Sequence, residues 1–159
     1  MKATTTAALA AMVLAATCPG SAVAAPTDAS DGPIAAAAAP VTAAAVTAAL
    51  SKVGASYASG AAGPNAFDCS GLTMWALARA GIAAPHSSYA QYAMGTAVAR
   101  SDIHRGDLVF FDSAGAGASH VALATSATTA VSATNHGVMT HPIFDAYWGG
   151  SYVGARRLS

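Results

Sequence analysis

Cysteine is scarce in this sequence, which has only Cys18 and Cys69 among its 159 residues. Lys2, the apolar run from Ala7 to Ala16 and the triplet Ala22-Val23-Ala24 are typical of a secretory signal peptide with an A-x-A cleavage site. Cleavage after this triplet removes Cys18, so the mature protein has one cysteine and no intramolecular disulfide. Exported thiols usually pair or react, and a single one indicates a reactive thiol.

Charge is also scarce. Seven basic and seven acidic side chains make up 9% of the residues, cancel in formal net charge and form no basic stripe, so nucleic acid is not an expected partner. The apolar run from Ala7 to Ala16 is shorter than the ~20 residues of a membrane span, and we expect no stable membrane insertion. An N-terminal membrane anchor and a lipoprotein acylated at Cys18 are the alternatives.

Metal-ligand patterns and internal repeats are missing as well. The five histidines have no paired cysteines and no acidic partner at helical spacing, so we expect no metal site and no cofactor. They are His86, His104, His120, His136 and His141.

Three regions follow from the composition: a signal peptide over 1–24, an Ala/Pro-rich leader over 25–40, and one domain over 41–159. The leader has almost nothing large enough to bury, which predicts disorder. A short alanine helix is the alternative, and Pro33 and Pro40 count against it. A mature length of ~135 residues suits a single domain, expected to be a monomer.

Hydrophobic periodicity places helices first and strands later in the domain. Helices are expected over 41–53, from the cysteine to about residue 80, and briefly over 86–92; a glycine-rich loop covers 57–66. Strands are expected over 108–111, 120–125, 129–133 and 138–143, with a last one around Val153, and 126–128 would join two of them as a hairpin. This order predicts an α+β fold with an antiparallel sheet.

The stretch Phe67-Asp68-Cys69-Ser70-Gly71-Leu72 sets the cysteine where an apolar helix begins. Unpaired N–H groups and the dipole at a helix N-terminus favour a thiolate and can lower a cysteine pKa from ~8.5 to between ~3.5 and ~7.5. Cys69 is therefore a candidate nucleophile, with inert packing as the alternative.

Four sequence blocks together resemble the NlpC family of papain-like cell-wall endopeptidases, from about Val41 onward. They are the cysteine stretch 67–72, the segment 105–111, His120-Val121, and the segment 154–157. The resemblance implies a papain-like fold, with N-terminal helices packed on the sheet. It also implies a secreted or wall-associated cysteine peptidase that cuts peptidoglycan stem peptides, commonly beside a D-glutamyl residue.

In this reading Cys69 is the nucleophile and His120 takes its proton and returns it to the leaving amine. Tyr57 matches a family tyrosine beside the thiol and would help bind the oxyanion with the Cys69 N–H, or else pack under the helix. By the same resemblance, Asp68 and Ser70 would contact the polar end of the stem peptide. A purely structural N-cap is the alternative for Asp68.

The sequence departs from the family at the residue that orients the imidazole, usually His, Asn or Gln. Ser132 holds that position, and its oxygen is a short acceptor. Asn135 or His136 would serve if the strand ended early or bulged, whereas His141 is expected at the surface. Two smaller departures are Ser59, where the family often has tryptophan, and His86, where arginine is frequent; both bear on substrate choice.

Ser132 leaves a second function open: a degenerate module that binds stem peptides without cutting them. Acyl transfer on the same scaffold, or a secreted antibacterial toxin, is a further alternative. The absence of an apolar extension for lipid favours wall peptides as the substrate.

Overall fold

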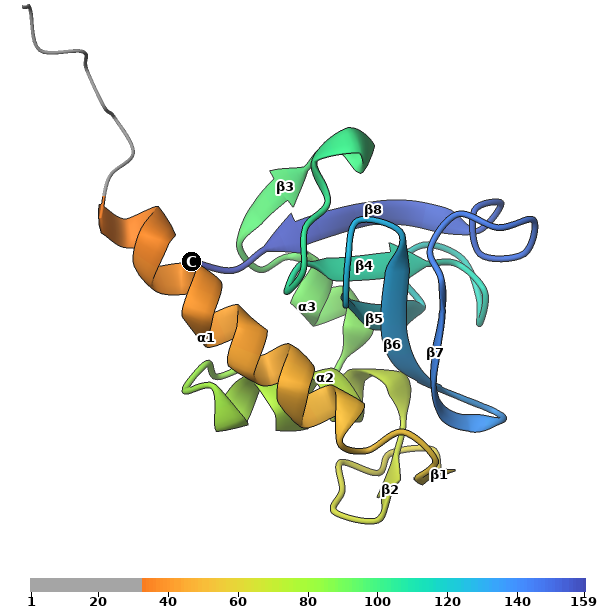
Figure 1. Ribbon diagram of the computed structural model, residues 1–159. Helices are drawn as coiled ribbons and strands as arrows, with labels where there is room; N and C mark the ends of the chain where they lie inside the picture. Colours follow the sequence, from red (N-terminus) through yellow and green to blue (C-terminus); the bar gives the residue numbers. More distant parts are fainter. Residues whose placement is uncertain (1–32) are drawn as a thin grey trace, which may run out of the picture. The chain divides into compact units, whose positions relative to one another are not determined.

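The structure is a computed structural model and describes residues 33–159 (Figure 1). The expected signal peptide, Cys18 and residues 25–32 of the expected leader lie outside the described residues. The elements are, in order, α1 (Pro33–Leu50), β1 (Ser56–Tyr57), β2 (Ala66–Phe67), α2 (Cys69–Arg79), α3 (Ser88–Tyr92), β3 (Thr96–Val98), a 3-10 turn (Arg100–Asp102), β4 (Leu108–Phe111), β5 (His120–Ala124), β6 (Thr129–Thr134), β7 (Gly137–Pro142) and β8 (Tyr152–Arg157).

Helix α1 begins at Pro33, inside the segment expected to be a disordered leader, so residues 33–40 differ from that expectation. Proline is favoured in the first turn because its missing N–H would be unpaired there anyway, and alanine is the best helix former. The helix ends at Leu50, before the expected Val53, and residues 51–54 form turns.

Six strands form one antiparallel sheet in the order β3-β8-β4-β5-β6-β7, and the predicted α+β class is confirmed. The strand expected around Val153 does not extend an edge of the sheet. It is β8, which lies between β3 and β4 (Figure 1). Sequence periodicity missed β3, because three residues are too few to show alternation.

Strand β4 alternates its side chains between two apolar layers and is buried on both faces. Leu108 and Phe110 face the cluster that α1 and α2 complete with residues such as Val46 and Leu72. Val109 and Phe111 face a second cluster on the other side of the sheet. The helices therefore cover one face only, and the second cluster includes aromatic side chains that reach the candidate site.

No helix within residues 33–159 has the length and apolar character needed to cross a membrane.

Candidate active site

Helix α2 begins at Cys69, as the sequence predicts. Asp68 is its N-cap and accepts a hydrogen bond from the Gly71 N–H at 2.6 Å. Gly71 has to be a glycine because a Cβ there would collide with the Ala61 carbonyl and approach the His86 ring. The glycine-rich loop thus packs directly on the first turn of the helix and fixes where the thiol lies.

The Asp68 carboxylate is held by several donors besides Gly71. It accepts from the Gly60 N–H at 2.8 Å and from Ser70 Oγ at 3.1 Å, and it pairs with His86 Nε2 at 2.9 Å. Burial alone would raise the Asp68 pKa, but the Gly71 N–H, the His86 ring and the Gly60 N–H together lower it. The structure therefore supports the N-cap reading of Asp68, and neither Asp68 nor Ser70 is among the residues that line the cavity.

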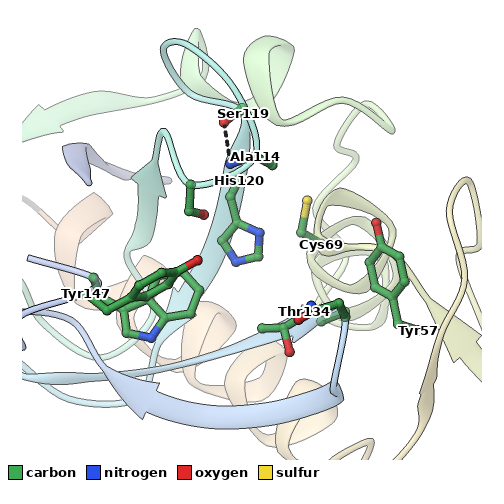
Figure 2. A pocket seen from close by; sticks show the side chains of 11 residues that line it. Tyr57, Cys69, Ala114, Ser119, His120, Thr134 and Tyr147 are labelled. Carbon is green, nitrogen blue, oxygen red and sulfur yellow. Dashed lines mark hydrogen bonds between the residues drawn. The ribbon is translucent and has the colours of Figure 1, made fainter. Parts of the chain in front are cut away.

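A cavity of about 270 Å³ opens over the thiol (Figure 2). It brings the N-terminus of α2 together with the start of β5, the end of β6 and the segment after β7. Its lining residues are Tyr57, Cys69, Ser113, Ala114, Ser119, His120, Ala133, Thr134, Asn135, Tyr147 and Trp148.

His120 is the first residue of β5 and is only 6% exposed. Its ring lies inside the cavity, with one nitrogen turned toward Cys69 (Figure 2). The backbone of Val121, the next residue of the strand, acts to lower the pKa of the Cys69 thiol. The structure thus brings together the cysteine and the histidine that the sequence analysis paired.

Burial shifts both reacting groups toward their neutral forms. It raises the pKa of Cys69, assisted by the charge of Asp68, although the N–H groups of Val121, Ser70 and Cys69 oppose this rise. It also lowers the pKa of His120 to about 4, assisted by His141. Desolvation thus shifts the pKa of Cys69 in the direction opposite to the one expected from the helix N-terminus alone.

Tyr57 lines the cavity beside the thiol and is 42% exposed. Partial burial, and then the charges of Cys69 and Asp68, raise the pKa of its phenol. The hydroxyl therefore stays protonated through neutral pH and can donate a hydrogen bond into the cavity. This placement fits the oxyanion role better than packing beneath the helix.

The expected support for His120 is not found. The Nε2 atom of His120 is buried and has no hydrogen-bond partner among residues 33–159. Ser132 is buried on β6, but its Oγ lies 2.9 Å from Nε2 of His141 instead. Strands β5 and β6 pair only at Leu123↔Val131 and Ala124↔Ala130, near their hairpin, and the short serine does not bridge the rest.

Asn135 and His136 do not take over this role. Strand β6 pairs regularly with β7 through Thr134↔Gly137, so it neither ends early nor bulges, and the two residues form the exposed hairpin tip. Asn135 lines the cavity, whereas His136 does not. Neither is hydrogen-bonded to the buried Nε2 of His120.

The expectation that His141 lies at the surface is wrong. His141 is 4% exposed, and its ring stacks on Trp148 with centroids 4.0 Å apart. Burial lowers its pKa. Sequence reasoning also missed Trp148; the adjacent aromatic pair Tyr147-Trp148 after β7 was the available signal, because such rings often line binding sites.

Within residues 33–159, no three side chains of the His, Cys, Asp or Glu type lie close enough together to hold a metal ion.

Comparison with known proteins identifies relatives of this domain. The NlpC/P60 family matches residues 54–157. A probable endopeptidase of Corynebacterium glutamicum is 50% identical over 88 residues, which cover 55% of this chain and 41% of the relative. The probable endopeptidase p60 of Listeria innocua is 41% identical over 110 residues, which cover 69% of this chain and 23% of that protein. The chain thus spans less than half the length of these relatives.

Solved structures share the fold. An NLP/P60-family protein of Staphylococcus aureus, described as similar to a lipoprotein, superposes with a TM-score of 0.69 at 28% identity, over 76% of this chain and 42% of that one. The P60 domain of a Mycobacterium avium paratuberculosis antigen gives a TM-score of 0.64 at 25% identity, over 79% and 98% of the two chains. The fold is therefore the papain-like one, and this chain belongs to the NlpC/P60 family.

Proposed function

We propose that this chain is a secreted cysteine endopeptidase that hydrolyses peptide bonds in bacterial peptidoglycan stem peptides, next to D-glutamyl residues. The observation that carries the proposal is the meeting of Cys69 at the start of α2 with His120 at the start of β5 inside one cavity. The family and the relatives described as probable endopeptidases support it. Secretion rests on the signal-peptide pattern of residues 1–24.

The reaction begins with attack of the Cys69 sulfur on the scissile carbonyl carbon. The thiol proton moves to the His120 nitrogen that faces it, and the carbonyl oxygen takes up the negative charge. Tyr57 and the N–H at the helix start donate to this oxygen. Collapse breaks the C–N bond, the imidazolium protonates the leaving amine, and a thioester remains on Cys69. Water, deprotonated by His120, then releases the carboxylate and restores the thiol.

Burial favours the neutral form of each residue taken separately, and this bears on the timing of proton transfer. Because the lone thiolate and the lone imidazolium are both disfavoured, we expect the proton to move as the sulfur attacks the substrate. His120 acts as the general base in this step.

Replacement of Cys69 by alanine tests the proposal. We expect Cys69→Ala to abolish the release of stem-peptide fragments from purified peptidoglycan, as followed by mass spectra of the muropeptides. The thiol supplies the bond-forming atom, so no residual acyl-enzyme route exists. Ser101→Ala, on the exposed 3-10 turn and outside the lining of the cavity, controls for the effect of a small substitution. Wild-type fragment release by a folded Cys69→Ala protein would disprove the proposal.

A binding module that does not cut is the second candidate, and one observation favours it. In the part of the chain that the structure describes, Nε2 of His120 has no hydrogen-bond partner, so the usual means of holding the ring is missing there. The same mass spectra separate the two functions: a binding module retains muropeptides of unchanged mass, whereas the peptidase shortens them.

A further inference from the structure

Trp148 lies beside the catalytic imidazole where a polar partner would be expected. The centroids of the His120 and Trp148 rings are 5.3 Å apart, and the rings are inclined by 33°. Trp148 also lines the cavity that holds Cys69. The indole is therefore a direct neighbour of the unsupported imidazole.

Trp148 is itself held from several sides. Its backbone N–H donates to Asp145 Oδ1 at 2.7 Å, and the Tyr147 N–H donates to the same oxygen at 3.0 Å. Phe111 from β4 meets its ring edge-on with centroids 4.9 Å apart. The loop after β7 thus presents the indole in one orientation.

The remaining face of the indole rests on His141, stacked at 4.0 Å with an interplanar angle of 21°. His141 Nδ1 lies 2.8 Å from the Pro142 carbonyl, which can only accept, so Nδ1 carries the proton. In the neutral ring Nε2 is then the acceptor, and Ser132 Oγ donates to it at 2.9 Å. Ser132 therefore fixes the ring on which Trp148 stacks.

We propose that Trp148 is the positioning residue for His120: its ring, seated on His141, holds the imidazole against Cys69 in place of a hydrogen bond to Nε2. Contacts between stacked or inclined rings favour particular ring orientations, so the indole can select one rotamer of the imidazole. In this arrangement Ser132, at the position of the family's orienting residue, acts on His120 through two intervening residues, His141 and Trp148. The inference rests on the proposed cysteine-peptidase function.

The test measures alkylation of Cys69 by iodoacetamide, which requires no peptidoglycan. The thiolate is the alkylated species, and its formation depends on a correctly held base. The titratable groups around His120 are Cys69 from α2 and His141 from β7, with Asp145 acting on His141. The alkylation rate is therefore recorded from pH 5 to 9 for each variant.

We expect Trp148→Ala to lower the alkylation rate at pH 7 by about tenfold or more, because a freed imidazole no longer faces the thiol. Trp148→Phe should stay within about threefold of wild type, because a ring remains against His120. Trp75→Phe is the matched control: the other tryptophan lies on α2 between Lys52 and Arg79, outside the cavity. It should alkylate as wild type.

A rescue separates positioning from loss of structure. Ser132→Asn, added to Trp148→Ala, puts an amide oxygen on β6 where the indole has left room, and should restore most of the lost rate. Three results overturn the proposal: wild-type alkylation in Trp148→Ala, a loss in Trp148→Phe equal to that of the alanine variant, or no recovery in the double variant. If Trp148→Ala were alkylated at the wild-type rate and only its KM for muropeptides were raised, Trp148 would contribute to substrate binding and not to the positioning of His120. Failure of the peptidase function leaves these alkylation outcomes readable, because they involve no substrate.

Discussion

At Cys69, burial and position at the helix N-terminus have opposite effects on the pKa of the thiol, and His120 shows the effect of burial as well. The helix N-terminus supplies N–H groups that favour a thiolate, which is all that the sequence reveals about Cys69. The fold adds a sheet packed over the thiol, and the resulting desolvation is the largest influence on the pKa of both residues. A sequence motif can place a nucleophile, but its protonation depends on what covers it.

The lowered pKa of His120 predicts a pH-dependent stability. His120 has a pKa of about 4 in the folded state against 6.5 when unfolded, so between these values the unfolded chain binds more protons and stability falls as pH falls. From pH 7 to 5 we expect a loss of about 2 kcal/mol from this group. His141, whose pKa is also lowered, adds to the loss in the same direction.

Urea unfolding at pH 7 and pH 5 measures this loss. His120→Gln removes one of the two histidine contributions, so its free energy of unfolding should change less between the two pH values than that of wild type. His136→Gln, at the exposed hairpin tip, is the control and should follow wild type. Equal pH dependence in wild type and His120→Gln would contradict the assignment.

Sequence alone predicted that Cys69 and His120 would lie together, but not which residues support them. Cys69 and His120 are recognisable because the residues around them match sequence blocks of the NlpC family. The hydrogen-bond partner of Ser132 cannot be recognised in this way. It depends on how far β5 and β6 separate beyond their two paired positions. The prediction that His141 is exposed failed because alternation along β7 shows only which face of the sheet a side chain occupies. Whether that face is covered depends on the loop that carries Trp148.

The first turn of helix α2 is tied to other segments of the chain through Asp68. Asp68 joins the cap, the Gly60 N–H of the loop and His86, which precedes α3. The position of the thiol is thus set by contacts from three segments. Here His86 takes a place where the family often has arginine, and the shorter side chain still reaches the carboxylate.

Loss of the cap should destabilise the protein measurably. We expect Asp68→Ala to lower the free energy of unfolding by about 1–2 kcal/mol, because the Gly71 N–H loses its acceptor at the helix start. Asp68→Asn keeps an accepting oxygen and should lose less than half as much. Urea titration of both variants beside wild type measures the difference. Equal losses in the two would show that charge, rather than capping, carries the effect.

At the scale of elements, long or strongly patterned segments were predictable. The apolar run of β4 and the helix from Cys69 follow from composition and periodicity. The start of α1 could not be predicted, because Pro33 and the alanines after it suit both a disordered leader and the first turn of a helix. The central place of β8 depends on pairing with β3 and β4, which no local pattern encodes.

For the molecule as a whole, Arg157 ties β8 to the turn that precedes β4. Its guanidinium donates to both oxygens of the buried Asp107 at 2.8 Å, and Nη2 also donates to the Asp102 carbonyl at 2.7 Å. Asp107 Oδ2 accepts from the His104 N–H as well. Two of the blocks that carry the family resemblance, 105–111 and 154–157, are therefore joined by one bidentate pair.

Removing one partner of this pair should lower the free energy of unfolding by more than that residue contributes on its own, because the other partner is left without its counter-charge. Asp107→Ala leaves several donors unpaired, and Arg157→Ala leaves the buried carboxylate with the His104 N–H but without its cationic partner, so each should lose about 3 kcal/mol of unfolding free energy. The double variant should lose clearly less than the sum of both, which a double-mutant cycle by urea unfolding measures. Asp102→Ala keeps the carbonyl that Arg157 uses and serves as control. Strict additivity would show that the two residues act independently.

The central position of β8 also sets an order of events during synthesis. Cys69 and His120 emerge from the ribosome before Trp148 and before the strand that pairs with both β3 and β4. Long-range pairing of this kind closes late, because the entropy of closing the loop must be met before the contacts form. A nascent chain that already contains the proposed nucleophile and base therefore has no assembled cleft, and we expect the proposed hydrolytic activity only after β8 has taken its place.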